Sequence, residues 1–317
     1  MSTTIQRQTV RALPFITLEV FLLAVLAAQP VFSEDREKDS APVGETCVYK
    51  KVGDHELKLF IIKPVGWKAM DRRPALVFFH GGGWVGGTPS QFNEQAAYLT
   101  TRGLVCVQVE YRLIRGKQGP PEDCVRDAKS SIRWVRAHAD GLGIDPERIG
   151  AAGGSAGGHL AAFVGLVDGQ DDPQDDLKVS PKANALLLFN PVFDNGTEGG
   201  WGQARVGERM KEFSPAHNIS ADDPPAIVFL GSQDKLIPVA TVERFQANMK
   251  AAGVRCDAFF YAGQPHGFFN KEPFKSATLV EADIFLASLG WLSGPPTMKA
   301  PDLTDISPPE AKKKQRK

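Results

Sequence analysis

The sequence predicts an α/β protein built on a mostly parallel sheet with helices on both faces. Three observations lead to this class. Short apolar runs of strand length recur along the middle of the chain, amphipathic segments separate them, and two of the runs end in glycine-rich turns. Strands that are apolar throughout are covered on both faces, which is typical of parallel strands joined by helical crossovers.

Four of the predicted strands are nearly continuous apolar segments, at residues 75–79, 104–109, 185–189 and 226–230. Two more strands are predicted at residues 148–152 and 257–261, directly before glycine- or histidine-containing loops. Further upstream, residues 47–52 and 57–62 are expected to form two antiparallel strands at one edge of the sheet. Their lengths of five or six residues suit strands better than helices.

Two segments between the strands have helical periodicity. Apolar residues recur at spacings of three and four between 125 and 139, and again between 239 and 249. That spacing predicts helices that lay one face on the sheet. Pro238 stands where the first turn of the second helix begins, a position that proline tolerates well.

Composition limits the function classes. The 317 residues are 42% hydrophobic, and 37 basic side chains balance 37 acidic ones. This is too apolar for a disordered chain and lacks the basic excess of a nucleic-acid binder. The irregular spacing of the four cysteines argues against a zinc site. The sequence still allows one disulfide bond. Cys106 and Cys256 lie in strand-like runs, where a small buried hydrophobe is expected.

The first 33 residues predict a secretory signal peptide. Arg7 and Arg11 precede an apolar run over residues 15–28, and small or modest side chains lead to a cleavage site after Ser33. The protein is therefore expected to be secreted or periplasmic, with no stable membrane span after cleavage. An uncleaved anchor and a buried N-terminal helix are the alternatives.

Residues 294–317 predict a flexible basic tail. This segment holds five prolines and ends in a cluster of five Lys and Arg residues at 312–317. Contact with an acidic polymer or lipid headgroups is an alternative role. The first 33 residues carry a net charge of +1 and the last six carry +5, so residues 34–311 carry −6. One folded domain over residues 34–293 remains between the two basic ends.

The segment Gly153–Gly158 carries the strongest chemical signal. It reads Gly-Gly-Ser-Ala-Gly-Gly and lies between a predicted strand and a helix that starts near residue 159. A tight turn there would project Ser155 above the sheet as a nucleophile. A phosphate-binding turn is the alternative. However, neither Gly-x-Gly-x-x-Gly followed by a ribose-binding acid nor Gly-Lys-Ser/Thr, the two glycine motifs that bind nucleotides, is present.

A second glycine motif, His80–Trp84, directly follows the strand at 75–79. Acyl transfer places negative charge on a carbonyl oxygen, and glycines let backbone N–H groups turn towards it. Gly82, Gly83 and Ala156 are the predicted oxyanion donors. His80 is interpreted as a structural brace, because a catalytic base is expected later in the chain.

A serine nucleophile needs a base and an acid that orients it. Asp234 and His266 each follow a predicted strand, and the order Ser155, Asp234, His266 is the one expected for such a site. Asp194, after the strand at 185–189, is the rival acid. The other histidines lie on predicted helices or in polar stretches and fit less well.

Together with Tyr111-Arg112-Leu113, these motifs resemble the α/β-hydrolase superfamily. The chain is more closely similar to bacterial esterases of the hormone-sensitive lipase and feruloyl or acetyl esterase (BD-FAE-like) type, over about residues 45–292. The resemblance implies an eight-stranded sheet and ester hydrolysis through an acyl-enzyme. Gly154 and Arg115 stand where many relatives carry an acid. The short N-terminal segment implies a minimal lid, and hence short acyl groups.

The sequence therefore predicts a serine carboxylic-ester hydrolase that acts on a small-molecule or carbohydrate ester. Acetylated and feruloylated carbohydrates are candidate substrates. No nucleic-acid partner, cofactor or metal is expected, and the acidic stretch 168–176 is interpreted as a solvated loop rather than a calcium site. A prolyl-oligopeptidase-like serine peptidase and a non-catalytic ligand-binding relative are the alternatives.

Overall fold

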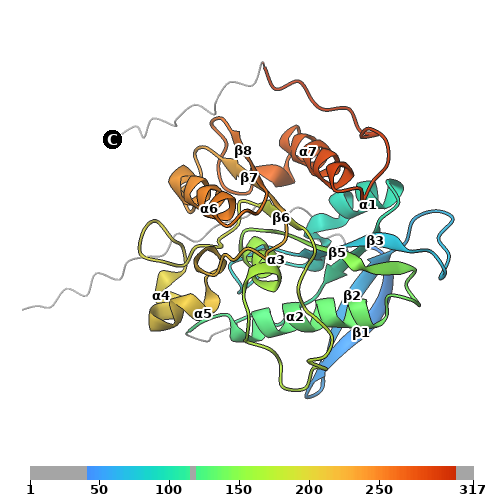
Figure 1. Ribbon diagram of the computed structural model, residues 1–317. Coiled ribbons are helices and arrows are strands. Elements are labelled where there is room, and N and C mark those ends of the chain that lie inside the picture. Colours follow the sequence, from blue (N-terminus) through green and yellow to red (C-terminus); the bar gives the residue numbers. More distant parts are fainter. Residues whose placement is uncertain (1–40, 115–118, 305–317) are drawn as a thin grey trace, which may run out of the picture. The chain divides into compact units, whose positions relative to one another are not determined.

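One eight-stranded sheet organises residues 41–114 and 119–304, which are the residues that this computed structural model describes (Figure 1). The strands are β1 (Glu45–Val52), β2 (His55–Ile62), β3 (Arg73–Phe79), β4 (Val105–Val109), β5 (Ile144–Gly154), β6 (Leu186–Phe189), β7 (Ala226–Gly231) and β8 (Cys256–Tyr261). The α-helices are α1 (Asn93–Thr101), α2 (Glu122–Ala137), α3 (Ala156–Leu166), α4 (Gln203–Val206), α5 (Met210–Phe213), α6 (Val239–Ala251) and α7 (Phe274–Ser288). Four short 3₁₀ helices are η1 (Pro89–Phe92), η2 (Gly207–Arg209), η3 (Pro215–His217) and η4 (Phe268–Asn270).

The strand order is β1-β2-β4-β3-β5-β6-β7-β8. The β1–β2 and β2–β4 pairs are antiparallel, and the pairs from β4 to β8 are parallel. This confirms the predicted mostly parallel sheet with an antiparallel edge. The register matters for function: Phe79 at the end of β3 pairs with Val109 of β4 and Gly153 of β5. The loops that follow these strands therefore leave the sheet at one edge.

Each face of the sheet is covered by its own set of helices (Figure 1). Helices α2, α3 and α6 pack on one face, where Val77 and Phe79 of β3 join the core. Helices α1 and α7 pack on the other face, where Leu76 and Phe78 point. The alternation along β3 shows why its sequence is apolar at every position, because both faces are buried.

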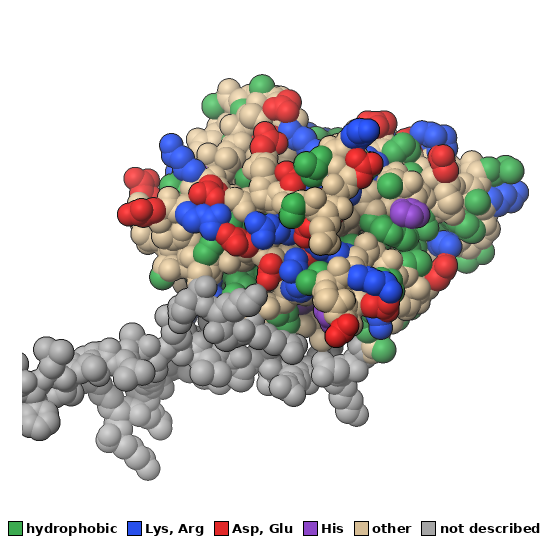
Figure 2. All heavy atoms as spheres, turned by 90° about the horizontal axis from the view of Figure 1, so that it is seen from below, with side chains coloured by type: hydrophobic (Ala, Val, Ile, Leu, Met, Phe, Trp, Pro, Cys, Tyr) green, Lys and Arg blue, Asp and Glu red, His purple; other side chains and the backbone are tan. Residues whose placement is uncertain are grey.

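The acidic stretch 168–176 is paired in part, which corrects the interpretation of a wholly solvated loop: Asp168 and Asp176 are exposed, whereas the other three aspartates form ion pairs. Asp172 contacts the buried Lys50 of β1 at 2.7 Å, and Arg133 of α2 bonds Asp175 at 3.0 Å. Figure 2 shows basic and acidic side chains side by side over the face that it draws. No group of three or more His, Cys, Asp or Glu side chains within residues 41–114 and 119–304 is arranged to hold a metal ion.

The first part of the predicted tail packs against the domain. Met298 and Leu303 are partly buried against the core on the α1–α7 face, and Arg102, directly after α1, donates to the Gly294 carbonyl at 3.0 Å. Residues 294–304 thus contact the fold, whereas a flexible segment was expected from Gly294 onward. The apolar side chains of Met298 and Leu303 pack against the core, a contact that the proline-rich composition of this segment did not predict.

The predicted signal peptide and the basic run at 312–317 lie outside the described residues. Among the residues that are described, no helix combines the length and the apolar character needed to cross a bilayer.

All four cysteines lie in the described residues and none forms a disulfide. Cys106 is buried, as expected for its strand, whereas Cys256 is half-buried. Burial raises the pKa of the Cys106 thiol to about 12, so this thiol stays protonated and unreactive at neutral pH.

A buried ion pair joins α1 to α7. Asp283 of α7 is fully buried, and its Oδ2 accepts hydrogen bonds from Arg102 Nε at 2.7 Å and from Tyr98 Oη at 2.5 Å. Its Oδ1 accepts a third bond from Arg102 Nη2 at 3.2 Å. A charge in this position is tolerated because each carboxylate oxygen has a donor.

We expect Asp283→Ala to lower the free energy of unfolding by about 3–5 kcal/mol, because the Arg102 guanidinium would lose its buried partner. Urea unfolding followed by circular dichroism measures the change. Glu56→Ala is the matched control, since it breaks an exposed pair with Lys51 and should change stability far less than Asp283→Ala does. Equal effects of the two substitutions would contradict the prediction.

Candidate active site

The predicted site residues follow the ends of four strands at the carboxyl edge of the parallel sheet. The His80–Trp84 loop follows β3, and Ser155 lies between β5 and α3. Asp234 lies in the loop after β7, and His266 lies in the turn between β8 and η4. Carboxyl ends of parallel strands meet at one edge of an open sheet, which is where such folds bind ligands.

Ser155 occupies a strained turn. Its φ of +54° and ψ of −118° are unusual for a residue with a side chain, and its N–H donates to the carbonyl of Phe189, the last residue of β6, at 3.0 Å. A Cβ at Gly153 would lie 2.2 Å from the Gly157 oxygen, and one at Gly157 would lie 1.9 Å from the Phe79 oxygen. Only glycine fits at these two positions, so the flanking glycines are what allow the turn to close.

The structure brings Ser155, His266 and Asp234 into one hydrogen-bonded chain. Ser155 Oγ lies 2.8 Å from His266 Nε2, and His266 Nδ1 lies 2.7 Å from Asp234 Oδ2. A carboxylate accepts only, so Nδ1 carries the proton and Nε2 presents a lone pair to the serine hydroxyl. The ring is thus oriented to take a proton from Ser155.

Asp234 is held in place by its own loop. Its side chain is fully buried, and Oδ1 accepts from the N–H groups of Leu236 at 2.8 Å and Ile237 at 3.0 Å. The rival acid, Asp194, is engaged elsewhere: Oδ2 bonds Arg244 at 2.7 Å, and Oδ1 accepts from Gly196 N–H. The structure therefore pairs His266 with Asp234, and Asp194 with Arg244.

The His80–Trp84 loop lies beside the serine turn. A Cβ at Gly81 would be 3.5 Å from the Ser155 Cβ. Gly82 and Gly83 have φ values of +110° and +60°, which glycine adopts without strain. Within the described residues, neither N–H has a hydrogen-bond acceptor, whereas Gly81 N–H donates to Gln91 Oε1 at 2.6 Å.

Ala156 is the first residue of α3, so its N–H is among those that an α-helix leaves unpaired at its N-terminus. The positive end of the helix dipole adds to any attraction for negative charge there. Gly82 and Gly83 in the neighbouring loop, and Ala156 next to Ser155, thus carry N–H groups that are free to donate within the part of the chain that the structure describes.

His80 braces the loop from beneath. Its ring stacks on Tyr111 with centroids 4.3 Å apart, and the Tyr111 hydroxyl donates to the His80 carbonyl at 2.7 Å. Burial lowers the pKa of the His80 imidazole to about 4, so the ring is neutral at pH 7. Its position agrees with a structural role rather than a role as a base.

The segment between β6 and β7 contributes residues that the sequence did not single out. A Cβ at Gly83 would lie 3.7 Å from the Trp201 ring, and that ring lies 5.3 Å from the buried Trp84 ring, centroid to centroid. Trp201 belongs to no recognisable motif, so only the tertiary fold places it beside the loop. Asn190, directly after β6, contacts both His266 and Gly267.

The structure also explains why residue 154 is a glycine, where many relatives carry an acid. A Cβ at Gly154 would lie 2.3 Å from the Phe269 ring. This aromatic side chain occupies the space that an acidic residue would need. Arg115, the other departure, lies outside the described residues.

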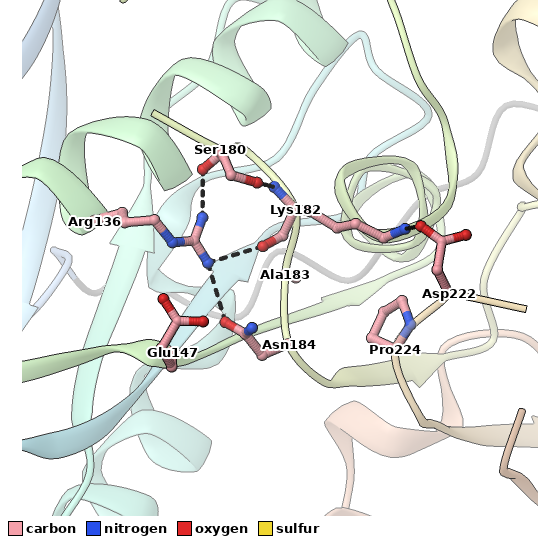
Figure 3. A pocket seen from close by; sticks show the side chains of 8 residues that line it. All are labelled: Arg136, Glu147, Ser180, Lys182, Ala183, Asn184, Asp222 and Pro224. Atoms are coloured by element: carbon pink, nitrogen blue, oxygen red, sulfur yellow. Dashed lines mark hydrogen bonds and ion pairs between the residues drawn. The ribbon is translucent and has the colours of Figure 1, made fainter. Parts of the chain in front are cut away.

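Two cavities lie away from the serine. One of about 340 Å³ is lined by residues that precede β6 and β7, together with Arg136 of α2 and Glu147 of β5, away from the carboxyl ends of the strands (Figure 3). Its basic groups are paired: Arg136 bonds the Asn184 side chain at 3.0 Å, and Lys182 bonds Asp222 at 2.8 Å. The other, of about 280 Å³, is lined in part by Asp194 and residues of α6. Ser155, Asp234 and His266 line neither cavity.

Comparisons with known families point to ester hydrolases. Residues 63–194 match the BD-FAE family, and residues 206–292 match the dienelactone hydrolase family. The apo form of Thermogutta terrifontis esterase 2 is 45% identical, with a TM-score of 0.77, over 82% of this chain and 99% of that chain. The same esterase phosphorylated by paraoxon aligns with a TM-score of 0.75 at 45% identity, over 80% of this chain and 97% of that chain.

Curated relatives agree with this assignment. Esterase LipC of Mycobacterium tuberculosis is 29% identical over 62% of this chain and 53% of its own length. An acetylxylan esterase of Xylanibacter ruminicola is 29% identical over 71% of this chain and 46% of its own length. The chain thus spans about half the length of the curated relatives that it matches. These relatives favour an ester hydrolase over a peptidase or a non-catalytic binding protein.

Two buried histidines beside the site predict a loss of stability in mild acid. Burial lowers the pKa of both His80 and His159 to about 4 from an ordinary value of 6.5. The unfolded chain therefore binds more protons between these values, and the free energy of unfolding falls as pH drops from 6.5 towards 4. We expect each histidine to contribute a loss of about 2 kcal/mol between pH 7 and pH 5.

Urea unfolding at pH 7 and pH 5 measures this loss. His159→Gln should shrink the difference between the two pH values, because it removes one of the two groups. His138→Gln is the control, since that side chain lies at the exposed end of α2 and should leave the difference unchanged. A wild-type stability that does not change between the two pH values would contradict the prediction.

Proposed function

Because the chain belongs to the α/β-hydrolase superfamily, as a BD-FAE-like serine ester hydrolase, we propose that Ser155, His266 and Asp234 form its catalytic triad. The observation that carries the proposal is the continuous chain of contacts, 2.8 Å from Ser155 to His266 and 2.7 Å from His266 to Asp234. Its members follow the ends of three different strands, so only the folded chain assembles them.

The proposed reaction begins when His266 Nε2 removes the hydroxyl proton of Ser155. Ser155 Oγ then attacks the ester carbonyl, and the negative oxygen is stabilised by the N–H groups of Gly82, Gly83 and Ala156. The intermediate collapses to an acyl-enzyme as His266 returns the proton to the departing alcohol. A water molecule repeats these steps and releases the carboxylic acid. Asp234 stabilises the imidazolium in both halves.

We propose short acyl groups as the preferred substrates. Support comes from Trp201, whose ring lies beside Gly83 and limits the space next to the proposed oxyanion site. Solved structures of Thermogutta terrifontis esterase 2 have propionate and butyrate bound, and both are short carboxylates. Acetylated or feruloylated carbohydrate is the proposed natural class, supported by the acetylxylan esterase among the relatives. Secretion through residues 1–33 stays a prediction.

Substitution of the triad tests the proposed roles. Ser155→Ala should abolish hydrolysis of 4-nitrophenyl acetate, and Asp234→Asn should lower kcat by about 10³–10⁴-fold, since His266 would lose the partner that fixes its tautomer. Asp194→Asn is the matched control and should retain activity within about tenfold. Full activity in Ser155→Ala, or a larger loss in Asp194→Asn than in Asp234→Asn, would overturn the assignment.

A panel of 4-nitrophenyl esters tests the acyl preference. We expect kcat/KM to be highest for acetyl to butyryl esters and to fall at least about tenfold for decanoyl esters, because Trp201 restricts the space near Gly83. Trp201→Ala should raise activity on the longer esters relative to acetate. A wild-type preference for decanoyl esters would contradict short-acyl specificity. Release of acetate from acetylated xylan, measured alongside, tests the carbohydrate class.

A further inference from the structure

Asn190 is a fully buried polar residue that the proposed mechanism does not use. It directly follows β6, has a φ of +34°, and donates its backbone N–H to the Phe229 carbonyl at 2.7 Å. Asparagine is enriched among residues with positive φ. The backbone conformation and this hydrogen bond fix where the Asn190 side chain begins.

The orientation of the Asn190 amide follows from its partners. Gly267 N–H lies 3.0 Å from Asn190 Oδ1, and an N–H group can only donate. The oxygen must therefore face Gly267, which leaves Nδ2 facing His266 Nε2 at 3.4 Å. Asn190 thus holds the turn that carries His266 and presents an N–H group to the ring nitrogen that receives the serine proton.

The Asn190 amide interacts differently with the neutral and the protonated forms of the His266 ring. In the neutral ring, Nε2 has a lone pair, and the Asn190 amide can donate weakly towards it. Once Nε2 has taken the proton from Ser155, two donors face each other and the amide gives no stabilisation. The amide therefore favours the neutral base and helps the proton leave Nε2 for the departing alcohol.

We propose that Asn190 is a positioning residue that holds His266 against Ser155 and disfavours a proton resting on Nε2. The inference rests on the proposed triad. Among the described residues, the polar side-chain contacts of the imidazole come from Asp234 on Nδ1, and from Ser155 and Asn190 on Nε2. Asp234 supplies the nearby charge and is left unaltered in the test.

The test is the pH profile of kcat/KM for Asn190→Asp with 4-nitrophenyl acetate. Aspartate is nearly isosteric, so one oxygen can still accept from Gly267 N–H. The other oxygen would face Nε2 and stabilise the protonated ring. We expect the acidic limb to move up by at least about one pH unit and kcat at pH 7 to fall about tenfold or more, with little change in KM.

Asn270→Asp is the matched control. Asn270 tethers the same turn through the Gly267 carbonyl at 3.1 Å, but its side chain has no contact with the imidazole among the described residues. A carboxylate there should leave the acidic limb within about 0.3 pH unit of the wild type. If both variants move the limb equally, general charge near the turn explains the shift and the inference is overturned.

An unchanged acidic limb in Asn190→Asp would show that the side chain at position 190 does not act on Nε2, and it would also overturn the inference. Should circular dichroism show that Asn190→Asp is unfolded, Asn190→Ser replaces it, since it removes the amide without adding charge. An upward shift of the limb is again expected, and an unchanged limb again overturns the inference.

Ser155→Ala separates this inference from the proposed function. If Ser155→Ala is inactive and the Asn190 variants leave the acidic limb unchanged, the proposed triad is supported and the proposed role of Asn190 is wrong. If Ser155→Ala hydrolyses the ester at the wild-type rate, the triad itself is wrong and the Asn190 inference falls with it.

Discussion

The close approach of the serine turn to the end of strand β3 is the constraint on which the site depends. No side chain fits at Gly153 or Gly157, because a Cβ would lie 2.2 Å or less from a backbone oxygen. The turn can therefore pack against Phe79, the last residue of β3, and Ser155 is left with a positive φ that costs about 1–3 kcal/mol. Since the His80–Trp84 loop starts where β3 ends, the same contact positions the serine hydroxyl and the neighbouring glycine N–H groups. The stability of the sheet is what maintains this strained turn.

Each of the other polar groups of the site is held by a hydrogen bond, in which a donor of one residue meets an acceptor of another. Two backbone N–H groups hold the Asp234 carboxylate, which in turn holds His266. Tyr111 holds the His80 carbonyl and stacks on its ring. Asn190 holds Gly267, next to His266. In the proposed reaction, this fixed orientation means that little reorganisation is needed when charge develops on the ester carbonyl.

Local signals in the sequence predicted most of the fold and the central residues of the site. Apolar runs fixed the strands, and the two glycine motifs marked turns whose geometry only glycine allows, so Ser155, Gly82 and Gly83 could be proposed directly. Asp234 and His266 could then be proposed because each follows a predicted strand, in the chain order expected after a serine nucleophile. Asn190 and Trp201 could not be found this way, since a lone asparagine or tryptophan after a strand carries no motif. The pairing of residues 168–176 with Lys50 and Arg133, and the packing of Met298, likewise depend on contacts between distant segments.

The central claim is that Ser155 is the nucleophile that this geometry activates. Thermogutta terrifontis esterase 2, a structural relative, has been solved phosphorylated by paraoxon. Peptide mass spectrometry of this protein after reaction with paraoxon is therefore the most direct measurement. We predict one diethylphosphoryl group per chain, on the peptide that contains Ser155, with loss of esterase activity in proportion to labelling. Complete loss of activity with the phosphoryl group on another residue would contradict the account.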